Sequence, residues 1–130
     1  HVWPDTLDMM GWEIGDTGFD LVLARDIPVF VNSHFAPVCD AFLARQGLEK
    51  AEMAEPACHP GGGRVVDALA DYLGDDLAMT RSVLRAHGNM SSPTVLFVLD
   101  ALLAAGPIVK PTLLTALGPG FVGAMGVLTP

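Results

Sequence analysis

Apolar and polar residues alternate near the amino terminus. Apolar side chains occupy every second position from Phe19 to Leu23, and the residues between them include Asp20. This period of two predicts a strand with one face more buried than the other, which Trp12 and Ile14 can begin.

A helical pattern follows the strand. Asp26 can cap a helix, and Pro28 suits the first turn because proline has no amide hydrogen to leave unpaired there. The pattern extends to Gly47, and Pro37 should kink or divide the helix. The apolar residues that support it are Val29, Phe30, Val31, Val38, Phe42 and Leu43.

The middle of the chain carries two more helical patterns. Apolar residues from Val65 to Leu73 fall at helical spacing, and Gly74 follows as a stop. Another helix is predicted from Leu77 to Ala86. The acidic stretch from Leu48 to Pro56 predicts a surface connection, and Ala57 and Cys58 predict a short strand after it.

The last helical pattern is almost apolar on every side. Ser91 or Ser92 followed by Pro93 predicts its start, and Gly106-Pro107 predicts its end. A helix that is apolar all round must be covered on several sides, which indicates a central position.

Two apolar stretches close the chain. Residues 112–117 and 121–128 are separated by Gly118-Pro119-Gly120, which predicts a hairpin. Strands therefore alternate with helices and end in a pair of strands. This order predicts the α/β class, with a layered sheet and helices.

Composition limits the kinds of partner that the chain is expected to bind. Fifteen acidic and seven basic residues give a formal net charge of −8, which argues against nucleic acid. Hydrophobic residues make up 51% of the chain, with a mean hydropathy of +0.43. These values indicate a large buried interface. No membrane span is predicted, because no uncharged apolar run approaches roughly 18 to 20 residues.

The amino-terminal residues have neither the basic segment nor the apolar stretch of a signal peptide. Cys39 and Cys58 are interpreted as reduced thiols. A cytoplasmic location is therefore expected.

His59 and Asn89 are the candidate catalytic residues. His59 begins the run His59-Pro60-Gly61-Gly62, where the backbone can approach a ligand closely. Asn89 lies in the run from Gly88 to Ser92, which opens into the apolar helix. An imidazole and a carboxamide can jointly donate hydrogen bonds to an oxygen that gains negative charge, so acyl transfer is predicted. The alternatives are a structural histidine and an asparagine that tolerates a left-handed turn.

Neither cysteine is predicted to be a nucleophile. Cys39 lies in a predicted amphipathic helix, and Cys58 adjoins His59 on an extended segment, where successive side chains point in opposite directions. No C-x-x-C or H-E-x-x-H spacing is present, so no metal site is predicted.

Four segments resemble a known family. CHPGGGRVVDALADYLG, TRSVLRAHGNMSSPTVLFVLDAL and ALGPGF resemble the carboxy-terminal half of the chalcone synthase-like type III polyketide synthases, and MGWEIGDTGFDLVLARDIPVFV continues the resemblance upstream. The resemblance implies a thiolase-like half-fold, with residues 1–130 as a single C-terminal domain. The nucleophilic cysteine would belong to an N-terminal half absent from this chain, which alone would then be inactive.

The implied activity is decarboxylative condensation of malonyl-CoA onto an acyl-CoA starter. By resemblance, His59 and Asn89 activate the thioester and stabilise the enolate. Coenzyme A thioesters are the implied substrates, no further cofactor is expected, and a homodimer is implied. Leu117 stands where plant chalcone synthases usually have an aromatic residue, which favours a microbial relative that forms an alkylpyrone, a resorcinol or a naphthol.

The resemblance also implies a set of substrate-binding residues. Arg64 can bind coenzyme A phosphates, because guanidinium binds phosphate in a bidentate manner, or it can be a solvated first-turn arginine. Ser91 can line the cavity or cap the helix. The whole set is Gly61, Gly62, Arg64, Met90, Ser91, Gly118, Pro119 and Gly120.

Two other functions remain open. A β-ketoacyl-carrier-protein synthase III-like condensing enzyme shares the thiolase fold and also uses histidine and asparagine. Pro-Gly-Gly after His59 and Met-Ser-Ser after Asn89 favour the polyketide synthase. A non-catalytic module that binds an acyl thioester or a partner synthase subunit would also fit the apolar composition.

Overall fold

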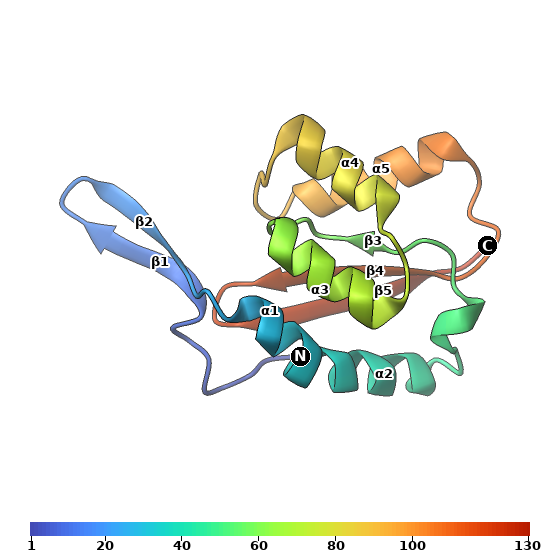
Figure 1. The fold of residues 1–130 in the computed structure, drawn as a ribbon, viewed down its shortest axis with the longest axis horizontal. Helices are drawn as coiled ribbons and strands as arrows, with labels where there is room; N and C mark the ends of the chain where they lie inside the picture. The colour runs from blue at the N-terminus through green and yellow to red at the C-terminus, as the bar shows by residue number, and fades with distance from the viewer.

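A computed structural model describes all 130 residues and contains two small sheets (Figure 1). The first is the antiparallel hairpin of β1 (Met10–Gly15) and β2 (Gly18–Leu23). The second has the strand order β3-β4-β5. Strand β3 (Ala57–Cys58) runs parallel to β4 (Thr112–Gly118), which is antiparallel to β5 (Val122–Leu128).

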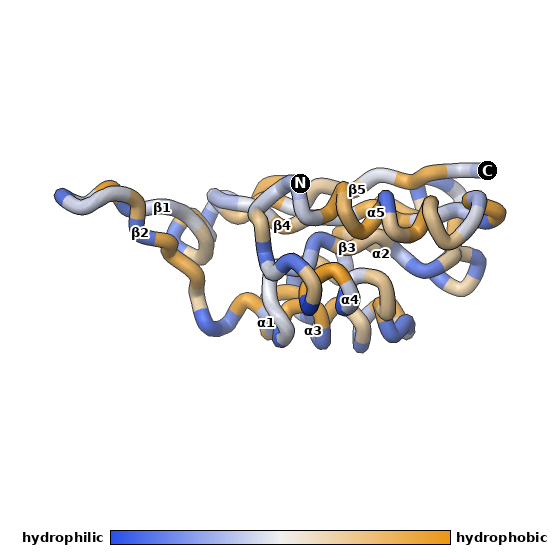
Figure 2. The backbone as a smooth tube through the Cα atoms, turned by 90° about the horizontal axis from the view of Figure 1, so that it is seen from above, coloured by the Kyte–Doolittle hydropathy of each residue, from blue (hydrophilic) through white to orange (hydrophobic).

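Helices flank the three-stranded sheet, and Figure 2 shows α1, α3 and α4 gathered on one side of it. Alternate residues of β4 face different clusters, as the period of a strand requires. Leu113 and Leu117 belong to the larger core, whereas Leu114 packs against the smaller cluster that contains Val83 of α4 and Val98 of α5. The helices are α1 (Ile27–Phe30), α2 (Ala36–Arg45), α3 (Gly63–Leu73), α4 (Ala78–His87) and α5 (Thr94–Ala105).

The larger core lies between the sheet and helices α1 to α3. Its buried residues come from every one of these elements, and both cysteines are among them. They are Ile27, Phe30, Val31, Phe35, Cys39, Leu43, Cys58, Val66, Ala68, Leu69, Leu77, Leu113, Leu117 and Phe121.

The hairpin of β1 and β2 corrects the prediction of a single strand. Residues 15–18, Gly-Asp-Thr-Gly, reverse the chain, with Gly18 at a φ of 135°. Trp12 lies opposite Leu21, and Ile14 opposite Phe19, so the apolar residues share one face. That face is exposed, with Phe19 at 70%, because the hairpin projects from the rest of the chain (Figure 1). The predicted burial of one face is therefore not met within this chain.

The predicted helix after Asp26 is confirmed and divides as expected. A π-helical turn, Val31–Phe35, joins α1 to α2 just before Pro37. Proline removes one intrahelical hydrogen bond and crowds the preceding turn, and a π turn accommodates both effects. Pro28 occupies the first turn, but Asp26 makes no side-chain capping bond, so that part of the prediction is wrong.

The same continuous segment, Ile27–Arg45, is long and apolar enough to cross a membrane by length and composition alone. Sequence analysis passed over it because Asp40 interrupts the uncharged run. One-third of the most apolar 18-residue stretch of this segment is buried. The buried side chains of the segment, such as Phe35 and Leu43, belong to the larger core. Core helices commonly satisfy the same criterion.

The remaining predicted elements are confirmed, but two expectations for α5, its serine cap and its burial on several sides, are not met. Neither Ser91 nor Ser92 caps the helix through its side chain. Leu96, Phe97 and Leu103 are 58%, 44% and 49% exposed, so this chain does not cover the helix on several sides.

Candidate functional site

His59 begins the loop that follows strand β3. Its amide donates a 2.8 Å hydrogen bond to the carbonyl of Thr115, which continues the pairing of β3 with β4. The imidazole is half-buried, and burial lowers its pKa, so the ring is neutral near pH 7. Its Nδ1 is buried without a hydrogen-bond partner. An unpaired buried N–H is costly, which favours a proton on Nε2 and leaves Nε2 as the donor toward a ligand.

Asn89 binds to the histidine loop directly. Its Nδ2 donates a 3.1 Å hydrogen bond to the carbonyl of Gly61, and its Oδ1 accepts a 2.9 Å bond from the amide of Ser91. A carboxamide NH₂ carries two hydrogens, so one remains available for a ligand. The structure thus brings together two loops that lie thirty residues apart.

Thr94 fixes the turn that carries Asn89. Its hydroxyl accepts a 2.8 Å hydrogen bond from the amide of Met90 and donates a 2.7 Å bond to the carbonyl of Ser91. Thr94 is fully buried at the first residue of α5, and Ser91 has a positive φ of 65°. Sequence analysis missed this positioning residue because the two serines before it looked like better caps.

His59 and Asn89 line one cavity of about 160 Å³. Five predicted site residues do not line it. Gly62 and Arg64 lie at a neighbouring cavity, whereas Met90, Gly118 and Gly120 line neither cavity. The apolar wall, which sequence analysis largely missed, comes from the hairpin of β1 and β2. The lining residues are Met10, Trp12, Leu21, Leu23, His59, Gly61, Asn89, Ser91, Leu117 and Pro119.

The Gly118-Pro119-Gly120 loop turns β4 into β5, as predicted. Pro119 lines the cavity, and the amide of Gly120 donates a 3.0 Å hydrogen bond to the carbonyl of Met10. Gly120 has a φ of 87°, a conformation that glycine adopts without strain. The loop therefore holds the base of the hairpin, and with it the apolar wall.

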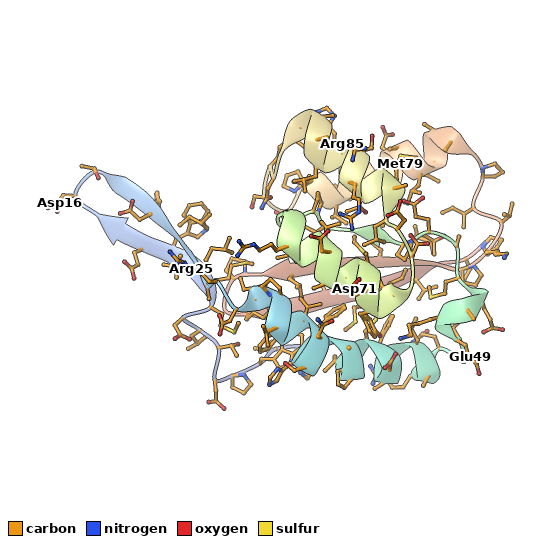
Figure 3. The ribbon with its side chains drawn as sticks, in the orientation of Figure 1. Asp16, Arg25, Glu49, Asp71, Met79 and Arg85 are labelled. Carbon is orange, nitrogen blue, oxygen red and sulfur yellow. The ribbon has the colours of Figure 1, made fainter.

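A neighbouring cavity of about 260 Å³ shares Gly61 and Leu23 with the first and contains Gly62, Arg64 and Arg25. Figure 3 shows Arg25 at the base of the hairpin. Among all cations of the chain, only Lys50 and Arg81 lie within 4 Å of a carboxylate, so both arginines at the cavity lack an acidic partner. Sequence analysis missed Arg25, whose only signal is its place directly after an apolar strand.

Both cysteines lie in the core, as predicted for Cys39. Burial raises the pKa of each thiol, so neither is a ready thiolate. Cys58 faces the core, whereas its neighbour His59 faces the cavity, in agreement with the alternation of an extended segment. The structure holds no group of three or more His, Cys, Asp or Glu side chains arranged to bind a metal ion.

Solved structures share this architecture. The crystal structure of 1,3,6,8-tetrahydroxynaphthalene synthase from Streptomyces coelicolor A3(2) aligns with a TM-score of 0.88 and 26% identity, over 98% of this chain and 38% of that one. The type III polyketide synthase domain of Steely1 from Dictyostelium also gives 0.88, at 27% identity, over 99% and 38%. The chain thus has a thiolase-like fold, of which it covers only a carboxy-terminal portion.

The chain belongs to the chalcone and stilbene synthase family, because residues 1–122 match the family model "Chalcone and stilbene synthases, C-terminal domain". A putative chalcone synthase of Bacillus subtilis (strain 168) is 38% identical over 119 residues, which cover 88% of this chain. A 1,3,6,8-tetrahydroxynaphthalene synthase of Streptomyces peucetius subsp. caesius is 38% identical over 126 residues, or 93% of this chain. The chain spans about one-third of the length of each relative.

Proposed function

We propose that this chain is the carboxy-terminal part of an acyltransferase that condenses malonyl-CoA, with loss of carbon dioxide, onto an acyl-CoA starter. The observation that carries the proposal is the convergence of His59 and Asn89 on one cavity, joined through the bond from Asn89 to Gly61. Relatives named as a chalcone synthase and a tetrahydroxynaphthalene synthase support the same chemistry.

In the proposed reaction, the bond between the malonyl carboxylate and the α-carbon breaks. Carbon dioxide leaves, and the electron pair moves into an enolate whose charge gathers on the thioester oxygen. The Nε2–H of His59 and the free N–H of Asn89 donate to that oxygen. The enolate carbon then attacks the acyl thioester of a cysteine, and the cysteine leaves as a thiolate.

The cavity beside Gly61 is the proposed site of the coenzyme A arm. Arg25 and Arg64 line it without acidic partners, in a chain of net charge −8. A pair of guanidinium groups suits the phosphates of coenzyme A. The shared residues Gly61 and Leu23 connect this cavity to the one that holds His59, so a thioester can extend from one to the other.

The nucleophilic cysteine comes from elsewhere in the proposed enzyme, because Cys39 and Cys58 are fully buried. The N-terminal half that would supply this cysteine can cover the exposed apolar faces of α5 and of the hairpin. A homodimer and a cytoplasmic location complete the proposal.

The test is the rate at which the complete enzyme decarboxylates malonyl-CoA. Asn89→Ala should lower that rate by about 10² or more, as expected for loss of one donor to an oxyanion. Ser92→Ala is the matched control, since Ser92 lies in the same turn, is exposed, and lines neither cavity. Unchanged decarboxylation by Asn89→Ala refutes the catalytic role and leaves a non-catalytic binding module.

A second comparison separates the two condensing enzymes. The proposed enzyme should react with acyl and malonyl groups carried on coenzyme A, and Arg25→Ala with Arg64→Ala should raise the KM for these substrates. Reaction only with carrier-protein thioesters would instead identify a β-ketoacyl-carrier-protein synthase III-like enzyme.

A further inference from the structure

We propose that the complete enzyme accepts extender units with a methyl branch on the α-carbon, of which methylmalonyl-CoA is the simplest. The proposal rests on the proposed function, because it concerns the extender whose thioester oxygen His59 and Asn89 would hold. The observation that carries it is a third cavity beside His59, which has a volume of about 20 Å³ and which we call the side cavity.

The side cavity lies where the two larger cavities meet. It shares Gly61 and Leu23 with both of them. Its walls also include Leu69 of α3 and Thr115 of β4, which line neither of the larger cavities. The side cavity therefore extends from the junction toward α3 and the sheet.

The wall of the side cavity suits a methyl group better than a water molecule. Seven of its ten lining residues are hydrophobic. The hydroxyl of Thr115 already donates a 3.1 Å hydrogen bond to the carbonyl of Ala124. An ordered water needs two to four polar partners, and about 10–15 Å³ is enough for one group of that size. The volume thus admits one methyl group, and the lining favours an apolar occupant.

The side cavity adjoins the donor edge of the imidazole. A Cβ added to Gly61 would lie 3.9 Å from Cδ2 of His59 and 3.9 Å from Cγ1 of Val65, and all three residues line the cavity. In the ring, Cδ2 is bonded to Nε2, the atom proposed to donate to the thioester oxygen. The α-carbon of an extender lies two bonds from that oxygen, and a branch on it lies three bonds away. The branch can therefore reach the space between His59 and Val65.

The methyl branch takes no part in the bonds that change. The bond between the carboxylate and the α-carbon breaks, carbon dioxide leaves, and the electron pair forms the enolate. The α-carbon then attacks the acyl thioester of the cysteine, which leaves as a thiolate. Each such extension adds one methyl branch to the product. Malonyl-CoA reacts in the same way without using the side cavity, so it remains a substrate.

A comparison of the two extenders in the complete enzyme tests the proposal. With the same starter, kcat/KM for methylmalonyl-CoA should lie within about tenfold of the value for malonyl-CoA, because a pocket that rejects one methylene discriminates by about 10- to 200-fold. Mass spectrometry should show methyl-branched products. A preference for malonyl-CoA greater than about tenfold overturns the proposal.

Substitution of Val65 tests where the branch lies. Val65→Ile adds one methylene beside Gly61 and should lower the ratio of kcat/KM for methylmalonyl-CoA to that for malonyl-CoA by about tenfold or more. Both extenders carry the same coenzyme A arm, so an effect on that arm cancels in the ratio. Val22→Ile is the matched control, since Val22 is half-buried and lines none of the three cavities. An unchanged ratio in Val65→Ile, or an equal change in both variants, argues decisively against this site.

Val65→Ala gives the opposite change and requires no extra volume. It should enlarge the side cavity and raise kcat/KM for ethylmalonyl-CoA relative to malonyl-CoA, and no increase would exclude the side cavity as the site of the branch. An enzyme that decarboxylates malonyl-CoA but not methylmalonyl-CoA refutes this inference alone. An enzyme that decarboxylates neither extender refutes the proposed function as well.

Discussion

Replacing Thr94 by Val tests whether a buried hydroxyl positions the carboxamide of Asn89, which is proposed to be catalytic. The substitution keeps the shape of the side chain but removes its bonds to Met90 and Ser91. Each bond contributes about 1 kcal/mol, and the amide and carbonyl left behind are only partly buried, so water recovers part of their loss. We therefore expect the free energy of unfolding to fall by about 2 kcal/mol in urea titrations.

The same variant should also lower malonyl-CoA decarboxylation in the complete enzyme, because the turn that holds Asn89 is loosened. Thr94→Ser is the matched control, since it keeps the hydroxyl and loses one methyl group. It should retain most of the decarboxylation rate. The reasoning is wrong if the free energy of unfolding of Thr94→Val lies within about 0.5 kcal/mol of that of the unaltered protein. It is also wrong if both variants lose the same fraction of the decarboxylation rate.

Three further predictions follow from single contacts. Gly123→Ala should destabilise the fold by about 1–3 kcal/mol, because the new methyl would overlap Trp3, whereas Gly126→Ala meets nothing within 4 Å and serves as the control in the same unfolding assay. Burial lowers the pKa of His59, so the unfolded chain binds a proton more readily than the folded chain. The free energy of unfolding should therefore be greatest above about pH 6.5 and should decrease as the pH falls below that value. His59→Gln should reduce this decrease. Trp12→Ala should enlarge the cavity and shift the products of the complete enzyme toward larger ones, and an unchanged product profile would exclude Trp12 as a size limit.

Local patterns predicted most of the helices because their signals lie within the elements themselves. Gly74 ends α3 in the left-handed conformation, as its position after an apolar run predicted. The hairpin of β1 and β2 was missed although the alternation shifts by one position between Ile14 and Phe19, because the turn at Asp16 and Thr17 that explains this shift was not recognised. The exposed face of α5 could not be predicted, because periodicity reports that a helix needs covering but not whether the same chain covers it.

The site was predicted in part for the same reason. His59 and Asn89 stand in distinctive runs, which marked both residues as candidates from the sequence. Their contact through Gly61, and the part played by Trp12 and Arg25, depend on how distant segments meet in space. Contacts between segments that are distant in the chain leave no periodic signal in a single sequence.

Gly61 lies where the two cavities meet, which matters for attempts to alter each cavity by mutation. Gly61 and Leu23 are the two residues that line both cavities, and a methyl group added at Gly61 would meet nothing closer than 3.9 Å in the protein. The fold therefore tolerates alanine at this position, and any cost would fall on the molecule that passes between the cavities. Trp12 lines only the cavity proposed for the acyl group, and Arg25 lines only the cavity proposed for the coenzyme A arm, so each can be substituted separately. A library that varies Trp12 and Arg25 and leaves both shared residues, Gly61 and Leu23, fixed would test substrate size and thioester affinity separately.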